Sequence, residues 1–324
     1  MGPTGFYQWL AEDPPILYYA AHSDEDIGDR LPESRVYRLP IYHWHRSADD
    51  IEREHLRARA NRPRHVLHHL INEREVTLDL QARGIPATFS NHNATIDERI
   101  FTVHEGANKV ADAVYSARMN PFKRHALAGA IPSLLMIGGV IASGDNQEYF
   151  DRIRALLPQA RFTHDEGRRW IPPDRVATAL NSARVGLCLS ACEGAMYSAT
   201  EYLLCGLPVV STASLGGRDE WFDPRYSRVV RDDPGAIADA VRELIALDLS
   251  PRWIRQQTLS RLWKHRRRLV DRVQDIYDRE QVGRDYAREW YARFFNKLGR
   301  WREFGELMLS LRTDCPRLDV PSGR

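Results

Sequence analysis

Short apolar runs alternate with amphipathic segments between residues 110 and 247 of the chain. The apolar runs predict strands, in VADAVYSA, LLMIGG, RFT, VGLCLS and PVVST. The segments between them have helical spacing of apolar positions, in DNQEYFDRIRALL, PDRVATALNSA, SATEYLLC and GAIADAVRELIAL. Because the longer runs are continuously apolar rather than alternating, they indicate parallel strands with helices on both faces. We therefore predict a doubly wound α/β domain over residues 109–250.

The first 108 residues have a less regular pattern. PILYYAAH, SRVYRLPIYHW and RHVLHHLIN fit strands or the starts of strands and helices, IPATFSN fits a strand, and SADDIEREHLRARANRPR fits a surface helix. We interpret residues 1–108 as a smaller α/β domain on the acceptor side. Long charged segments predict helices over residues 251–314 that pack back across the domains, and residues 315–324 form a tail.

Composition narrows the class of protein. With 46 Lys and Arg against 44 Asp and Glu, the net charge of +2 gives no global case for binding nucleic acid. The four cysteines form no Cys-x-x-Cys pair, which fits a reducing compartment. The N-terminus lacks the pattern of a secretory signal, and the run IPSLLMIGGVIA is too short to cross a bilayer. We expect a soluble, cytoplasmic protein.

Two glutamates stand out in the stretch SACEGAMYSATEYLLCGLPVVST. Glu193 follows the strand VGLCLS, and the carboxyl edge of a parallel sheet is where such folds bind ligands. After the small loop, a helix that begins near Tyr197 or Ser198 directs backbone amides to the same edge, where they attract anions such as phosphate. Alternatively, Ser198 and Glu201 form a capping box for that helix, and Glu193 is a solvated loop residue.

Cations and glycines follow two neighbouring strands. Arg118 and Lys123 come after the strand VADAVYSA and flank Asn120, so the predicted topology brings them to the same edge as Glu193. Gly216 and Gly217 follow the strand PVVST and permit close approach of the backbone to a ligand. This combination of groups predicts a site for a phosphorylated, hydroxyl-rich ligand, and a nucleotide sugar fits that description.

The motifs also occur in an informative order. Arg-x4-Lys precedes an apolar strand with Gly138-Gly139, then Glu193 and, after seven residues, Glu201, followed by Cys-Gly-x-Pro-Val-Val and Gly-Gly-x-x-Glu. This order resembles the retaining glycosyltransferases of family 4, over residues 110–225 and more weakly over GIPATFSNHNATIDERIF. The resemblance implies the GT-B architecture, in which two Rossmann-like α/β domains face a cleft. Here the N-terminal domain is short and C-terminal helices follow.

The resemblance also implies roles for individual residues. Arg118 and Lys123 would bind the donor diphosphate, Glu193 the donor sugar near its anomeric carbon, and Glu201 the nucleotide ribose. Further donor contacts would come from the two glycine-containing loops and the helix start, that is from Gly138, Gly139, Gly194, Ala195, Met196, Tyr197 and Ser198. Possible contacts to donor or acceptor are His22, His92, Asn120, Gly216 and Gly217. The implied enzyme is a retaining hexosyltransferase that uses a UDP or GDP sugar, with no cofactor and no metal.

Other interpretations stay open. An epimerase or phosphorylase of the same architecture, or a non-catalytic nucleotide-sugar-binding protein, would share this site. Asp24, Glu25 and Asp26 could bind a metal or cap a helix, and the N-terminal histidines could form a zinc site. The basic segment 252–273 could touch the inner face of a membrane, or it could be a packed helix with a solvated basic side. The aromatic residues Trp290, Tyr291, Phe294, Phe295 and Trp301 fit a core between the domains.

Overall fold

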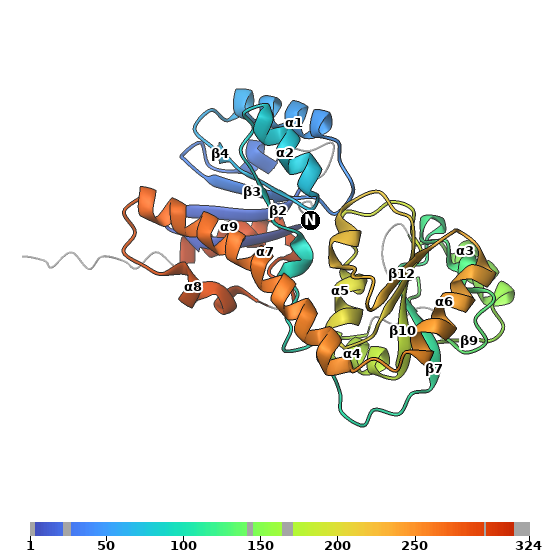
Figure 1. Ribbon diagram of the computed structural model, residues 1–324. Helices are drawn as coiled ribbons and strands as arrows, with labels where there is room; N and C mark the ends of the chain where they lie inside the picture. Colours follow the sequence, from blue (N-terminus) through green and yellow to red (C-terminus); the bar gives the residue numbers. More distant parts are fainter. Residues whose placement is uncertain (1–3, 22–26, 141–144, 164–170, 295, 314–324) are drawn as a thin grey trace, which may run out of the picture.

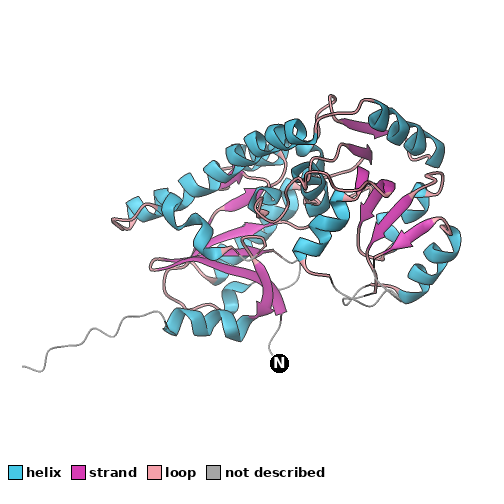
Figure 2. Cartoon of the chain, turned by 90° about the horizontal axis from the view of Figure 1, so that it is seen from below, coloured by secondary structure: helices cyan, strands magenta, loops and turns pink. Residues whose placement is uncertain are grey.

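The computed structural model describes residues 4–21, 27–140, 145–163, 171–294 and 296–313. Two lobes lie side by side, each built around its own β-sheet, and one long helix runs along both (Figure 1, Figure 2). The earlier part of the chain and its C-terminal segments form one lobe, and residues from the middle of the chain form the other.

The second lobe contains a six-stranded parallel sheet with strand order β12-β11-β10-β7-β8-β9 among the described residues. Its strands are β7 (Ala111–Ser116), β8 (Leu134–Ile137), β9 (Ala160–Phe162), β10 (Ala183–Cys188), β11 (Val209–Thr212) and β12 (Ser227–Val230). The helices are α3 (Gln147–Leu156), α4 (Pro173–Asn181), α5 (Tyr197–Leu204) and α6 (Pro234–Ala246), and β10 lies between α5 and α6 (Figure 1). Since β7, β8 and β10 are buried along almost their whole length, the prediction of a doubly wound domain is confirmed.

The order of these strands reverses between β7 and β10. The chain builds outward from β7 to β8 and β9, then returns to place β10, β11 and β12 on the other side. At such a point, the connections that follow the two central strands leave the sheet in opposite directions. A crevice therefore opens beyond the carboxyl ends of these strands. The segments that follow Ser116 and Cys188 therefore border the natural ligand position of this sheet.

The first lobe contains a sheet with the path β13-β1-β2-β3-β5-β6, and β4 pairs with β3. The strands β2 (Pro15–Ala20), β3 (Tyr37–Ile41), β5 (His69–Ile71) and β6 (Ala87–Phe89) are parallel, and β4 spans Val66–Leu67. At the other edge, β1 (Thr4–Glu12) and β13 (Arg300–Glu303) are antiparallel. The helices are α1 (Ala48–Asn61), which confirms the predicted surface helix, and α2 (Arg74–Ala82).

The C-terminal region departs from the prediction that residues 251–314 are helical throughout. The structure contains α7 (Pro251–Arg279), α8 (Tyr286–Glu289), the 3-10 turn η7 (Trp290–Arg293), strand β13 and α9 (Phe304–Thr313). The edge of β1 provides backbone partners that residues 300–303 satisfy, and Trp301 lies opposite Phe6. Gly299 packs so closely that an added Cβ would lie 2.2 Å from the Phe6 ring.

Helix α7 joins the lobes through its basic side chains. Arg266 is fully buried and donates to the backbone oxygens of Ala94 and Ile96 and to the Glu98 carboxylate. Burial raises the pKa of Glu98, but the Arg266 hydrogen bonds outweigh it and hold that pKa at about 2. Arg255 donates to the carbonyls of Glu98 and Leu204.

Two basic residues of segment 252–273, Arg255 and Arg266, are thus used inside the fold, whereas Arg252, Lys264, Arg267 and Arg268 are exposed. In the part of the chain that the structure describes, no helix has the length and apolarity needed to span a membrane. Contact of this helix with a membrane surface stays a prediction.

Candidate functional site

A cleft of about 810 Å³ opens at the carboxyl edge of the second sheet and takes residues from both lobes. The second lobe contributes the ends of β7, β8 and α5 and the loop after β10, with Ser116, Ala117, Arg118, Phe122, Lys123, Ile137, Gly138, Gly139, Ile171, Val176, Glu193, Met196, Tyr197, Ser198 and Glu201. The other wall consists of Phe6, His43, Trp44, His92, Asn296, Lys297, Gly299, Arg300 and Trp301. The crevice at the strand reversal is therefore closed by the first lobe and by the C-terminal segment.

Lys123 and Glu193 form a buried ion pair at the centre of this edge. Their residues are only 8% and 4% exposed, although both line the cleft. The Glu193 Oε1 atom accepts from the Lys123 ammonium and, at 2.6 Å, from the Ser190 hydroxyl. This excludes the alternative in which Glu193 is a solvated loop residue.

Local structure fixes the position of Lys123. It ends the 3-10 turn η3 (Pro121–Lys123), which Asn120 caps, and the Tyr115 hydroxyl donates to the Lys123 carbonyl at 2.6 Å. An ammonium group has three donors, so the Lys123 Nζ can keep its bond to Glu193 and still donate to a ligand in the cleft. The geometry favours a ligand with anionic oxygens beside Glu193.

Arg118 supplies a second cation beyond the end of β7. Its Nε donates to the Asp145 Oδ1 at 2.9 Å, and its side chain is about half exposed at the cleft wall. Arg118 and Lys123 therefore lie on the same wall of the cleft, as the motif spacing predicted.

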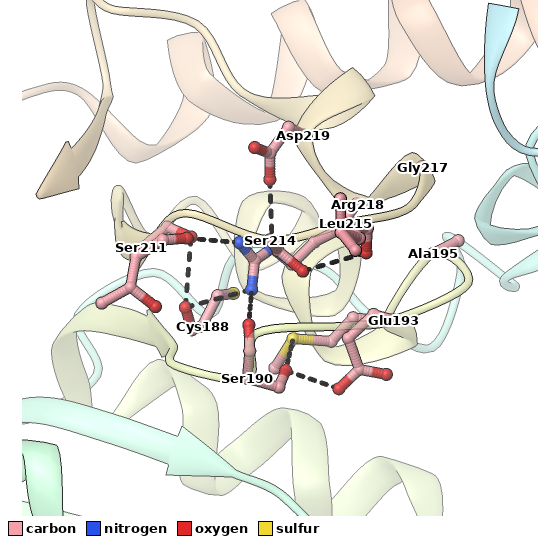
Figure 3. Close-up of polar contacts among 12 residues, drawn as sticks. Cys188, Ser190, Glu193, Ala195, Ser211, Ser214, Leu215, Gly217, Arg218 and Asp219 are labelled. Carbon is pink, nitrogen blue, oxygen red and sulfur yellow. Dashed lines mark hydrogen bonds and ion pairs between the residues drawn. The ribbon is translucent and has the colours of Figure 1, made fainter. Parts of the chain in front are cut away.

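A buried arginine that the sequence analysis did not single out holds the Glu193 loop in place (Figure 3). Arg218 is fully buried, and it donates to the carbonyls of Cys188, Ser190 and Thr212 at 3.3, 2.9 and 2.6 Å. These carbonyls lie at the ends of β10 and β11, so one side chain connects both strand ends. The only sequence signal was its place in the Gly-Gly-x-x-Glu motif, directly after Gly217.

The start of α5 faces the cleft without a capping side chain. Its N-cap is Met196, with φ of 52°, and no side-chain hydrogen bond caps the helix. The Ser198 hydroxyl donates to the Ser116 carbonyl at 2.7 Å, while the Glu201 carboxylate faces Lys297 instead of its own helix end. The alternative of a capping box from Ser198 to Glu201 is therefore wrong, and the N-terminal turn of α5 is exposed to a ligand.

Glu201 pairs with a residue from the far end of the chain. The Lys297 Nζ lies 3.7 Å from the Glu201 Oε1 and 3.7 Å from the centre of the Tyr197 ring. Burial raises the pKa of Glu201, and the Lys297 ammonium opposes this. Burial lowers the pKa of Lys297, while Glu201 favours its charged form. No motif near residue 297 pointed to this role.

Histidines of the first lobe reach the same space. The His92 ring centre lies 4.7 Å from Tyr197 and 5.3 Å from His43, all in the cleft wall. Burial and then the neighbouring His43 and Lys297 lower the pKa of His92 far below its usual value, so its ring is neutral. The His92 Nδ1 atom is buried and has no hydrogen-bond partner among the described residues.

The possible contact His22 and the possible metal ligands Asp24, Glu25 and Asp26 lie outside the described residues. Among the residues that are described, no group of three or more His, Cys, Asp or Glu side chains could hold a metal ion. Two of the histidines considered for a zinc site have hydrogen-bond partners in the fold: His69 bonds Tyr42 and His55, and His68 bonds Thr88.

Comparison with known proteins agrees with this geometry. Residues 112–246 match the family model described as glycosyl transferases group 1. The matched residues run from β7 to the end of α6 and so cover the second lobe. A comparison of the whole sequence with curated proteins finds no match.

Several solved structures resemble this chain over about three quarters of its length. HepE from Anabaena, solved in complex with UDP, has a TM-score of 0.55 and 14% identity over 75% of this chain and 79% of HepE. The pneumococcal O-GlcNAc transferase GtfA, solved with UDP and GlcNAc, has a TM-score of 0.54 and 13% identity over 76% of this chain and 53% of GtfA. AviGT4, involved in avilamycin A biosynthesis, has a TM-score of 0.52 and 18% identity over 76% of this chain and 75% of AviGT4. The chain has the GT-B fold.

Not every predicted site residue lines the cleft. Among the described residues, the cleft lining includes Arg118, Lys123, Gly138, Gly139, Glu193, Met196, Tyr197, Ser198, Glu201 and His92, and does not include Asn120, Gly194, Ala195, Gly216 or Gly217.

The glycines outside the lining lie where the lobes touch. The Gly194 amide donates to the His43 carbonyl at 3.1 Å, and an added Cβ at Gly217 would lie 2.4 Å from Asn72. Gly216 has φ of 108°, a conformation that side chains disfavour, and its position against Glu193 leaves no room for a Cβ. These glycines shape the Glu193 loop and the contact between lobes.

Proposed function

We propose that this protein transfers a sugar from a nucleotide diphosphate sugar to an acceptor hydroxyl, with retention of configuration and without a metal ion. The observation that carries the proposal is the Lys123–Glu193 pair at the strand reversal of a group 1 domain. It combines an ammonium group that suits a diphosphate with a carboxylate that suits sugar hydroxyls. Both face one cleft, together with Arg118 and the start of α5.

The charges act on the leaving group. Breaking the bond between the sugar and the phosphate adds negative charge to the departing diphosphate and positive charge to the anomeric carbon. Lys123, Arg118 and the first amides of α5 interact more strongly with the departing diphosphate than with the intact donor, which lowers the barrier. These fixed cations supply the positive charge that a metal ion would otherwise provide.

Glu193 and Glu201 then orient the two ends of the donor. Glu193, next to Lys123, would accept hydrogen bonds from sugar hydroxyls near the reacting carbon. Glu201 would accept from the ribose hydroxyls while Lys297 keeps it ionised. Met196, Tyr197 and Ser198, with Gly138 and Gly139 on the opposite loop, would enclose the diphosphate and sugar.

Retention fits attack on the face from which the diphosphate departs. In that route the leaving phosphate oxygen accepts the proton of the acceptor hydroxyl, and the new bond forms as the old one breaks. The ion pair with Lys123 and the hydrogen bond from Ser190 lower the nucleophilicity of the Glu193 carboxylate. We therefore favour the same-face route over a covalent sugar intermediate.

UDP sugars are the first donors to test. HepE and GtfA were both solved with UDP bound, and a thermal-shift panel of UDP, GDP, ADP and dTDP sugars compares the bases directly. A donor that binds only the folded protein raises its melting temperature, by an amount that grows with concentration. We expect one base to shift melting by several degrees. Release of nucleoside diphosphate that depends on an acceptor then separates a transferase from a binding protein, and an unshifted melting curve with every donor refutes the proposal.

A further inference from the structure

The wall of the cleft formed by the first lobe and the C-terminal segment exposes two tryptophans. Trp301 is 59% exposed and Trp44 is 47% exposed, and both line the cleft opposite the predicted donor residues. Exposing a large aromatic ring to water forgoes the free energy of burying it. Folding alone does not explain two such rings on one wall.

Strand pairing and ring packing fix the position of Trp301. It lies on β13, whose pairing with β1 fixes the backbone, and its ring packs against Phe6 at 6.2 Å and against His43 at 6.4 Å between ring centres. The sequence analysis placed Trp301 in a core between the domains, and its exposure corrects that interpretation. A rigid ring with an exposed surface presents a flat apolar platform.

Trp44 lies next to the reacting groups. Its ring centre is 5.1 Å from that of Phe122 in the opposite lobe, and the Phe122 ring centre is 4.8 Å from the Lys123 Nζ. Lys123 is paired with Glu193, so Trp44 is separated from the proposed site of sugar transfer by a single side chain. A group stacked on Trp44 is therefore close to the proposed anomeric position.

Resting on the proposed function, we propose that this wall is the acceptor subsite and that the acceptor is a saccharide, whose rings stack on Trp44 and Trp301. A sugar ring has an apolar face of C–H groups and an edge of hydroxyls. The two tryptophans offer flat partners for such faces, and His43, Lys297 and Arg300 line the same wall with polar groups for the hydroxyls. A lipid chain would instead need a continuous apolar channel.

Alanine variants at the two positions test the subsite, and the chain contains a matched control. Trp263 on α7 is 47% exposed, like Trp44, but is not among the residues that line the cleft in the described structure. With UDP-glucose and UDP-GlcNAc as donors, acceptor arrays of saccharides, lipid alcohols and peptides are compared by UDP release. We expect saccharides to be used. We also expect Trp44→Ala and Trp301→Ala each to raise the saccharide KM about tenfold, with UDP affinity kept and phenylalanine restoring most of the loss.

A second readout does not depend on turnover. The labelled full chain, loaded with UDP, is applied to a glycan array, where we expect binding that both alanine variants lose and that Trp263→Ala retains. Transfer only to lipid alcohols or peptides overturns the inference while leaving the proposed function intact. So does an unchanged saccharide KM in both variants, or glycan binding equal to that of the control. Failure of the wild type to bind any nucleoside diphosphate would instead refute the proposed function.

Discussion

The ammonium group of Lys297 lies 3.7 Å from the carboxylate of Glu201, although the two residues come from different lobes. The Ile96–Lys297 bridge and the 3.1 Å hydrogen bond from the Leu298 amide to the Thr95 carbonyl hold this segment in place. The proposed ribose-binding residue is therefore completed by a segment almost 100 positions further along the chain. The C-terminal segment is part of the site and not an appendage.

Replacing Lys297 should make nucleotide binding sensitive to pH. Burial raises the pKa of Glu201 and Lys297 opposes it, so Lys297→Met should raise that pKa further. The ionised carboxylate is then lost as pH falls through the higher pKa. We expect UDP affinity to fall more steeply in Lys297→Met than in the wild type as the pH is lowered from 8 to 6.

Calorimetric titrations of UDP across this pH range measure the effect. Lys297→Arg, which keeps the charge, should restore the pH profile of the wild type. Equal pH dependence in the wild type and Lys297→Met would show that Lys297 does not control the ionisation of Glu201.

Lys123 should affect both rate and stability. Lys123→Ala removes a cation from the departing diphosphate, and by analogy with donors that stabilise developing charge, kcat should fall on the order of 100-fold. It also leaves the buried Glu193 without its partner, which costs roughly 3 kcal/mol of folding free energy. The fold should persist at room temperature, with a lower melting temperature.

The double variant Lys123→Met/Glu193→Gln separates these effects. It removes both charges, so it should recover most of the lost stability and none of the activity. Glu193→Ala should likewise lose transfer. Activity close to wild type in any of these variants would contradict the proposed roles.

Arg218→Lys should disturb the Glu193 loop. A lysine ammonium cannot reproduce the forked donors with which Arg218 binds carbonyls at the ends of β10 and β11. We expect a loss of stability of about 2 kcal/mol and a clear drop in kcat. Arg225→Lys is the control, because Arg225 is exposed and its partners Asp223, Gln257 and Trp253 are not residues of the Glu193 loop. Melting curves and kcat that match the control would show that Arg218 does not position the loop.

Buried histidines should make the protein less stable in mild acid. Burial lowers the pKa of His125 to about 3, from a value near 6.5 in the unfolded chain, and burial also lowers the pKa of His69 far below that value. The unfolded chain therefore binds protons that the native state does not bind. As a result, the free energy of unfolding falls as pH drops below about 6.5. Urea titrations at pH 7 and pH 5 should show the loss, and His125→Phe should reduce it. If His125→Phe left the pH dependence of the unfolding free energy unchanged, the acid sensitivity would belong to other groups.

The sequence predicts the second lobe well because its signals are local. Continuous apolar runs identify the parallel strands, and a strand end followed by Arg118, Lys123 or Glu193 marks the edge where ligands bind. Once strand order is known, the position of these residues follows from topology. Identifying these charged residues required no knowledge of contacts between distant parts of the chain.

The remaining features depend on contacts between distant residues. β1 carries Phe6 and Trp9 but lacks a simple alternating pattern, and β13 becomes a strand because β1 offers it an edge almost 300 residues away. Lys297 and Trp301 acquire their places from that non-local packing, and Arg218 from its contacts with the ends of β10 and β11. The helix-like spacing of the C-terminal segment predicted a helix where β13 lies. Sequence periodicity carries no information about such pairings.

The proposed function requires that a nucleoside diphosphate binds in the cleft through Lys123. Calorimetric titration of UDP, GDP, ADP and dTDP into the wild type and Lys123→Ala measures this binding. We expect at least one nucleotide to bind the wild type at a single site and Lys123→Ala to weaken its affinity by tenfold or more. Equal affinity in both proteins, or no binding of any of the four, would contradict it.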